Sequence, residues 1–281
     1  TVSGPQDFSV DDQFAFFNPK AGLTFMLSQK QNLYFSYAKA QREPNRTDYE
    51  NGSPKPEKLN DFELGWRMKK EKIQAQANLY WMEYQDQLVL TGAIDEVGAP
   101  IRQNVGKSRR VGIEIEATIQ LADQWLFKPN LAVSSNQNLD FYFKRDGILQ
   151  SLGKTQLAYS PNIVGGNALV YAPSTHFQVG LLSKYVGKQY MGNINSENSS
   201  LPSYFISDIN AVFSWQPKKW VKEIQWSTTI NNIFNLKYLS NGYFYTYDDD
   251  WTSPGQTTTI EGAGYYPQAG LHFLSGLKLI F

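Results

Sequence analysis

The sequence of 281 residues predicts an all-β protein, an antiparallel sheet closed into a transmembrane barrel. Apolar and polar residues alternate with period two along many segments, as in strands with one apolar and one polar face. Aromatic residues make up 15% of the chain although its mean hydropathy is -0.44, which is typical of a barrel with a wet interior and aromatic girdles. The third observation is that short and long connections alternate along the chain.

The last segment, 270–281, has one face that is almost wholly apolar, because alternate side chains of a strand point to the same side. The residues on this face are Leu271, Phe273, Ser275, Leu277, Leu279 and Phe281. A terminal aromatic residue after such an alternation resembles the last strand of bacterial outer-membrane barrels. By that resemblance, Phe273, Leu277, Leu279 and Phe281 are expected to form the signal for insertion by the barrel-assembly machinery. An apolar last strand in a soluble β-sandwich is the alternative.

Ten further segments are expected to be strands, and with the last one they make about eleven. The eleven segments are 14–27, 33–40, 61–68, 73–81, 111–121, 125–135, 163–171, 177–186, 205–215, 224–230 and 270–281. The alternation is cleanest in 111–121, where isoleucines and other apolar residues alternate with Glu114 and Glu116. These glutamates are expected to point into the barrel.

The connections between these segments are expected to lie at two different ends of the barrel. Short polar turns alternate with five long connections, which are 41–60, 86–108, 136–159, 187–202 and 235–267. Outer-membrane barrels have short periplasmic turns and long external loops. Since the last strand must end at the periplasmic side, the long connections are expected outside the cell.

The strand count predicts that the chain is part of a larger barrel. Single-chain bacterial barrels have an even number of strands, and an open sheet edge in hydrocarbon leaves backbone groups unpaired. We therefore expect residues 1–281 to be the C-terminal portion of the barrel. Residues 1–10 lack the features of a signal peptide, so the true N-terminus of an exported protein is expected elsewhere.

Composition and motifs argue against several other classes. Cysteine is absent, which rules out disulfides and thiolate metal sites, and the net charge of +0 provides no general attraction for nucleic acid. No apolar run is long enough for a membrane helix. None of the common hydrolase, zinc-peptidase or phosphate-loop motifs occurs. We expect no catalytic residues, no metal site and no cofactor, and thus no enzyme.

Several sequence blocks, taken in order, resemble the spaced motifs of TonB-dependent outer-membrane receptors. The blocks are NLYFSYA (32–38), PEKLNDFELGW (56–66), QNVGKSRRVGIEIE (103–116), YSPNIVGGN (159–167) and NNIFNLKY (231–238), followed by the terminal Phe281. Each block also has a local structural explanation, such as turn-forming asparagines at a strand end. The blocks therefore report barrel architecture more than ligand identity.

The resemblance implies a complete receptor of twenty-two strands with an N-terminal plug and a TonB box, both outside this chain. Such receptors lie in the bacterial outer membrane, contact its lipid and are energised by TonB, ExbB and ExbD. They import scarce small molecules such as ferric siderophores, haem, cobalamin or glycans. A passive porin-like or adhesin-like barrel is one alternative, and a soluble β-sandwich binding module is another.

External ligand-binding residues are expected in the last long connection. Its tract contains Tyr243, Tyr245, Tyr247, Asp248, Asp249, Asp250 and Trp251. The rings are suited to a sugar or an aromatic siderophore, and the carboxylates to a hard cation such as calcium. The commoner explanation of such a tract is a solvated loop with aromatic residues at the membrane interface.

Two further groups of polar residues are candidates. Arg102, with Lys107, Arg109 and Arg110 nearby, is suited to an anionic ferric complex or to phosphates, although an ordinary charged strand end is the commoner case. The polar faces of the strands are expected to line the lumen and meet the plug, through Arg67, Gln74, Gln76, Glu114 and Glu116. For His272, a hydrogen-bonded side chain is expected in preference to a haem ligand.

Overall fold

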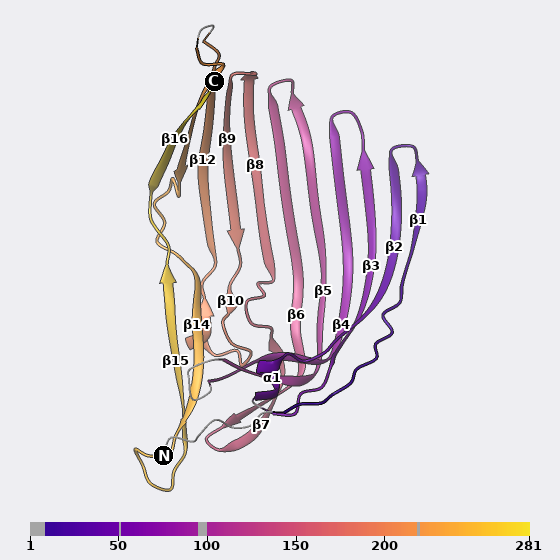
Figure 1. Cartoon of the computed structure of the whole chain (residues 1–281), viewed down its shortest axis with the longest axis vertical. Helices are drawn as coiled ribbons and strands as arrows, with labels where there is room; N and C mark the ends of the chain where they lie inside the picture. The colour runs from indigo at the N-terminus through magenta and orange to yellow at the C-terminus, as the bar shows by residue number, and fades with distance from the viewer. Residues whose placement is uncertain (1–8, 51, 95–99, 218–219) are drawn as a thin grey trace.

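The structure is a computed structural model and describes residues 9–50, 52–94, 100–217 and 220–281. Within these residues, eleven long strands follow one another in a single antiparallel sheet, which is curved and open (Figure 1). In order across the sheet they are β1 (Lys20–Ser28), β2 (Gln31–Arg42), β3 (Glu57–Lys69), β4 (Ile73–Ile94), β5 (Pro100–Ala122), β6 (Trp125–Arg145), β8 (Ile163–Ser174), β9 (Phe177–Val186), β12 (Tyr204–Trp215), β13 (Glu223–Asn231) and β16 (His272–Ile280). The predicted all-β class and the eleven strands are confirmed.

The register gives the sheet one apolar and one polar face. Leu79 on β4 pairs with Leu64 on β3 and Ile113 on β5, and these side chains share the apolar face. Leu79 is 50% exposed, because no second sheet covers this face. A soluble β-sandwich would bury such a face under a second sheet. The open apolar face instead suits contact with lipid.

The two ends of the sheet differ, as the lengths of the connections predicted. The short turns and the C-terminus lie at one end, and the long connections gather at the other (Figure 1). The prediction that the long connections are loops is only partly right, because they contain further elements. These are α1 (Arg46–Glu50), β7 (Ile148–Gln156), β10 (Gln189–Tyr190), η1 (Glu197–Ser199), β11 (Ser200–Leu201), β14 (Leu239–Asp249) and β15 (Thr258–Pro267). Strands β4, β5 and β6 also continue into this end.

The first strand begins later than the sequence predicted. The first strand was expected from Phe14, but β1 begins at Lys20. Pro19 directly precedes it and has no amide hydrogen to donate to a ladder. Its carbonyl still accepts a hydrogen bond of 2.9 Å from the amide of Lys39, which fixes the point where the chain joins the sheet.

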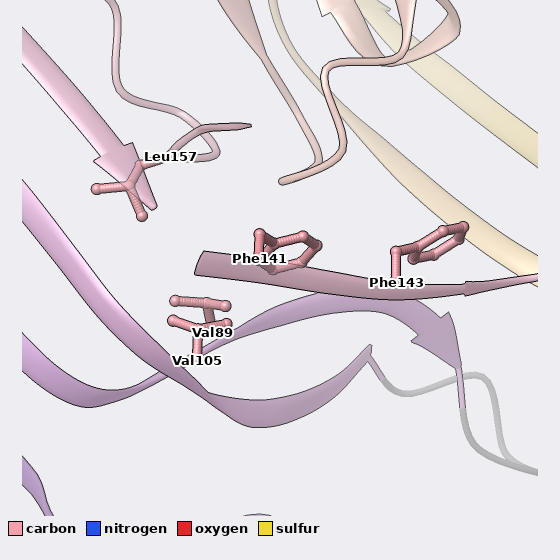
Figure 2. Close-up of a cluster of buried hydrophobic side chains, with 5 residues drawn as sticks. All are labelled: Val89, Val105, Phe141, Phe143 and Leu157. Atoms are coloured by element: carbon pink, nitrogen blue, oxygen red, sulfur yellow. The ribbon is translucent and has the colours of Figure 1, made fainter. Parts of the chain in front are cut away.

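The long connections have a hydrophobic cluster of their own, formed by Val89, Val105, Phe141, Phe143 and Leu157 (Figure 2). The cluster joins the extensions of β4, β5 and β6 to the segment that follows β7. Phe141 is only 1% exposed, whereas its neighbour Tyr142 is 58% exposed. The end of the molecule opposite the short turns is therefore a packed structure rather than a set of separate loops.

The last strand lies at the edge of the sheet. Phe273, Leu277 and Leu279 of β16 pair with the apolar residues Ile230, Trp226 and Ile224 of β13. The sheet path ends at β1 and β16, which do not pair with each other in the described part of the chain. Use of this strand as an insertion signal, with the terminal Phe281, stays a prediction. No helix in the described ranges is long and apolar enough to cross a membrane.

A charge on the apolar face should destabilise the barrel in lipid. We expect Leu79→Arg in the whole protein to cost about 2–4 kcal/mol if the residue lies near the bilayer midplane. Urea titration of the protein folded in lipid vesicles measures this cost. Gln76→Arg is the matched control, because Gln76 lies three residues away on the same strand but on the polar face, where it pairs with Glu116. Equal losses for both variants would contradict the assignment of faces.

Truncation of the central ring of the hydrophobic cluster should loosen the long connections. We expect Phe141→Ala to lower the local free energy of opening by about 3–5 kcal/mol, because it leaves a cavity in a packed site. Hydrogen exchange of the amides of β7 measures this opening. Tyr142→Ala removes a similar ring from an exposed position and should leave the exchange unchanged. Equal protection in both variants would show that the cluster does not hold this end together.

Candidate functional site

A cavity of about 440 Å³, which we call the arginine cavity, lies where the sheet meets the long connections. The side chains that give it its chemical character are Arg42, Glu57, Tyr84, Arg102, Arg110 and Tyr159. They come from β2, β3, β4, β5 and the segment after β7. Five parts of the chain that are distant in sequence therefore form one site.

The arginine cavity is positively charged. Three arginines and one glutamate line it, which gives a net charge of +2. Glu57 is already engaged, since Arg42 binds its carboxylate at 2.7 Å and the amide of Leu88 donates to it at 2.6 Å. Arg102 and Arg110 form no ion pair with any residue that the structure describes.

Arg110 is the most informative residue of the cavity. Its guanidinium carbon lies 4.3 Å from the centre of the Tyr84 ring, so the ring holds the guanidinium in place. Its Nη1 atom is buried and has no hydrogen-bond partner in the structure. A buried donor without a partner is costly, and an acceptor brought by a ligand would remove that cost.

Tyr159 closes the cavity toward the last long connection. Its hydroxyl donates a hydrogen bond of 2.9 Å to the carbonyl of Gly242 on β14. Burial, and secondarily the nearby Tyr266, raises the pKa of Tyr159 above its usual range. The phenol is thus neutral at physiological pH and adds a polar group without adding negative charge.

Of the four basic residues grouped with Arg102 in the sequence analysis, only Arg102 and Arg110 line the arginine cavity. Arg109 instead lies over the indole of Trp81, with its guanidinium carbon 5.4 Å from the ring centre. Sequence reasoning missed Arg42, Glu57, Tyr84 and Tyr159 as site residues. Glu57 and Tyr159 fall in the blocks 56–66 and 159–167, which report barrel architecture rather than a ligand site. The register of β2 to β5 brings Arg42, Glu57 and Tyr84 together, and Tyr159 joins them from the segment after β7.

The predicted lumen residues lie on one face of the sheet. The cross-strand pairs Arg67–Gln76 and Gln76–Glu116 align three of them, and Gln76 donates a hydrogen bond of 2.6 Å to Glu116. Gln74 and Glu114 occupy the same face through their own pairs. A second cavity of about 350 Å³ is lined by Arg67, Gln74, Gln76 and Glu116. Contact of these residues with a plug stays a prediction.

The aromatic tract of β14 forms a row of rings. The rings of Tyr243, Tyr245, Tyr247 and Trp251 are near-parallel, and successive centroids are 6.2, 6.4 and 5.9 Å apart. These residues lie on one face of the β14–β15 hairpin. The structure brings them together with one another but does not place them in the arginine cavity with Arg102.

The three aspartates of the tract do not converge. Asp248 accepts from the Thr259 hydroxyl at 2.8 Å and lies 3.7 Å from Lys144. Asp249 points to the other face and accepts from the amide of Thr252 at 3.0 Å, a bond that lowers the pKa of its carboxyl. Among the described residues, no group of acidic or histidine side chains is arranged to hold a metal ion. The arrangement does not favour a calcium site.

Glu261 fastens the other face of the β14–β15 hairpin to neighbouring connections. Its carboxylate binds Arg145 at 2.6 Å and accepts from Asn198 at 3.1 Å and from the hydroxyl of Ser196. Burial opposes ionisation of this carboxyl, but these hydrogen bonds and the charge of Arg145 outweigh it. The pKa of Glu261 is therefore lower than usual.

His272 uses both ring nitrogens in hydrogen bonds. Its Nδ1 lies 2.9 Å from the carbonyl of Gly270, and its Nε2 lies 3.2 Å from the side-chain amide of Asn231. This arrangement fits the expected hydrogen-bonded histidine rather than a haem ligand.

Together, the single antiparallel sheet with an open apolar face and the folded connections at one end are typical of an outer-membrane β-barrel. The family described as "TonB dependent receptor-like, beta-barrel" matches residues 2–236, and the chain belongs to this family. The recognition made from the sequence blocks is confirmed.

Comparisons with individual proteins find distant relatives. The catecholate siderophore receptor Fiu of Escherichia coli (strain K12) is 21% identical over 91% of this chain and 32% of its own length. The copper transporter OprC shares 19% identity, with a TM-score of 0.66 over 92% of this chain and 39% of that chain. The siderophore receptor PiuA from Acinetobacter baumannii also shares 19%, with a TM-score of 0.63 over 92% and 35%. At this level of identity the structures show a common fold, and this chain spans about a third of the length of these relatives.

Acid should release the hairpin that Glu261 fastens. The pKa of Glu261 is lower in the folded state than in the unfolded state. Its contribution to the stability of the hairpin is therefore complete above the ordinary carboxyl pKa and is lost as the pH falls through the folded-state pKa. We expect hydrogen exchange in β15 to accelerate over that acidic range. In the Glu261→Gln variant, hydrogen exchange in β15 should already be faster at neutral pH and should not accelerate further in acid. Glu71→Gln, in an exposed short turn, is the control, and an equal pH response in both variants would contradict the role of Glu261.

Proposed function

We propose that the chain is the C-terminal part of the barrel of an outer-membrane receptor that takes up an anionic ferric chelate. Membership of the TonB-dependent receptor family supports uptake of a scarce nutrient as the general activity. Similarity to a catecholate siderophore receptor favours the catecholate class among the possible chelates. A tris-catecholate complex of Fe(III) carries negative charge, which is the property that a cationic site selects.

The arginine cavity is the observation that carries this proposal. Its net charge of +2 lies in a concave site, where a positive charge is screened less than on an open surface. Planar guanidinium groups bind oxygen anions through several donors at once. Arg102 and Arg110 both line the cavity, and the Nη1 atom of Arg110 has no hydrogen-bond partner among the described residues.

Transport through the barrel is the second part of the proposal. The polar face that contains Arg67, Gln76 and Glu116 suits contact with a plug supplied by another part of the protein. Energy would come from TonB, ExbB and ExbD acting on that plug, and the barrel-assembly machinery would insert the strands. No catalytic step is proposed. A passive porin-like barrel would differ because its uptake would not require the proton-motive force.

Loss of the Arg110 guanidinium should weaken chelate binding. In the full-length receptor, we expect Arg110→Ala to raise the Kd for ferric tris(2,3-dihydroxybenzoate) about tenfold to a hundredfold, the usual worth of one hydrogen bond to a charged group. Binding of the chelate to purified receptor, followed by quenching of tryptophan fluorescence, measures this effect. Raising the salt concentration should weaken wild-type binding more than binding to the variant.

Arg109→Ala is the matched control, since it removes the same charge one residue away and outside the cavity. It should leave the Kd nearly unchanged. If both variants bind like the wild type, the arginine cavity is not the binding site. If the wild type binds no ferric catecholate but binds another anionic chelate, the catecholate class is wrong and the cavity assignment stands.

A further inference from the structure

The β14–β15 hairpin presents a continuous aromatic surface, which we call the aromatic platform. It consists of Tyr243, Tyr245, Tyr247, Trp251 and Tyr266. Tyr266 lies beyond Tyr243 at one end of the row, with its centroid 6.0 Å from that of Tyr243 and its ring tilted by 49° to it. Tyr243 is 50% exposed, Tyr266 51% and Trp251 65%. Exposed rings in one unbroken row are costly in water, which suggests that they serve contact with a ligand.

Glycines under the rings keep the platform flat. A Cβ added at Gly264 would lie 2.4 Å from Cε1 and Cζ of Tyr243, and one added at Gly262 would lie 2.4 Å from Cζ of Tyr245. The outer part of each ring therefore rests on the backbone of β15. The strand supports one side of each ring, while Tyr243 is exposed and Tyr245 is half-buried.

The opposite face of the hairpin holds it in place. Glu261 and Asp248 bind Arg145 and Lys144, and Thr246 is buried beside β4, where it pairs with Ala93. Because residues alternate along β14, these anchoring side chains point away from the rings. The platform is thus preformed, and binding to it orders little of the chain.

The charges beside the platform restrict the kind of ligand. Asp249 lies on the same face as Tyr247, and Asp250 is exposed next to it. These carboxylates repel an anionic chelate and accept hydrogen bonds from hydroxyl groups. A single small planar ligand would use only one ring of the row, whereas an extended chain uses several.

We propose that the aromatic platform binds a glycan chain with neutral sugars, whose pyranose rings lie with their C–H faces on the tyrosine and tryptophan rings. The faces of aromatic rings are negative and attract the partly positive hydrogens of C–H groups. The same chemistry would fit a free oligosaccharide and the polysaccharide part of lipopolysaccharide. This site is separate from the arginine cavity, and the inference does not rest on uptake of a ferric chelate.

The test uses full-length receptor in detergent and isothermal titration calorimetry. The probes are cellohexaose and maltohexaose for a free glycan, and delipidated polysaccharide from the host's lipopolysaccharide for a surface glycan. We expect at least one probe to bind, and we expect Tyr245→Ala to weaken that binding about tenfold by removing a central ring. Gly264→Ala should weaken binding to a similar extent, because the added Cβ displaces the ring of Tyr243. This variant disturbs the platform while keeping every aromatic residue.

Tyr142→Ala is the control, since it removes an exposed tyrosine from another connection. It should bind like the wild type. Binding of the hexaoses alone identifies a free glycan, and binding of the polysaccharide alone identifies a surface glycan. Absence of binding by every probe overturns the proposal. Equal affinity of wild type, Tyr245→Ala and Gly264→Ala also overturns it, whatever the result for ferric chelates.

Discussion

Pairing of the backbone in a medium without water is the constraint on which this structure depends. An unpaired amide or carbonyl in hydrocarbon costs several kcal/mol, so a membrane-spanning sheet must pair every strand. The ladder runs unbroken from β1 to β16. Strict pairing forces the side chains to alternate between faces, and the apolar surface around Leu79 and the polar surface around Gln76 follow from that alternation. The path ends at β1 and β16, which do not pair with each other in the part of the chain that the structure describes.

The same ladder also builds the end of the molecule that holds the long connections. Strands β4 and β5 stay paired from Ile73 and Ile119 to Leu90 and Arg102, well past the segment that the apolar alternation marks. Buried polar side chains then join neighbouring connections. Asn193 donates to the carbonyl of Leu90 at 2.8 Å and accepts from the amide of Ala158 at 2.9 Å. The residues of the arginine cavity are thereby fixed by backbone pairing and by a few buried amides, rather than by flexible loops.

The strand pattern was readable from sequence wherever one face of the sheet is apolar and the other is polar, because such a strand has a clean period of two. The extensions of β4, β5 and β6 were missed because this alternation is absent from them. Val105 and Phe141 pack against other connections, so polar and apolar residues no longer sort by face. Sequence analysis named Arg102 and Arg110 as candidates but not the cavity that they line, since the cavity depends on the register that places Arg42 and Arg110 around one space.

The distribution of charge explains how one chain can present two different binding surfaces. Equal numbers of basic and acidic residues, 26 of each, give no net field, and charges are screened over about 8 Å at physiological salt. Only local groupings can therefore select a ligand. The arginines left unpaired in the cavity favour an anion, while Asp249 and Asp250 beside the aromatic platform disfavour one. A charged chelate and a neutral glycan would thus be sorted between the two surfaces without competing for either.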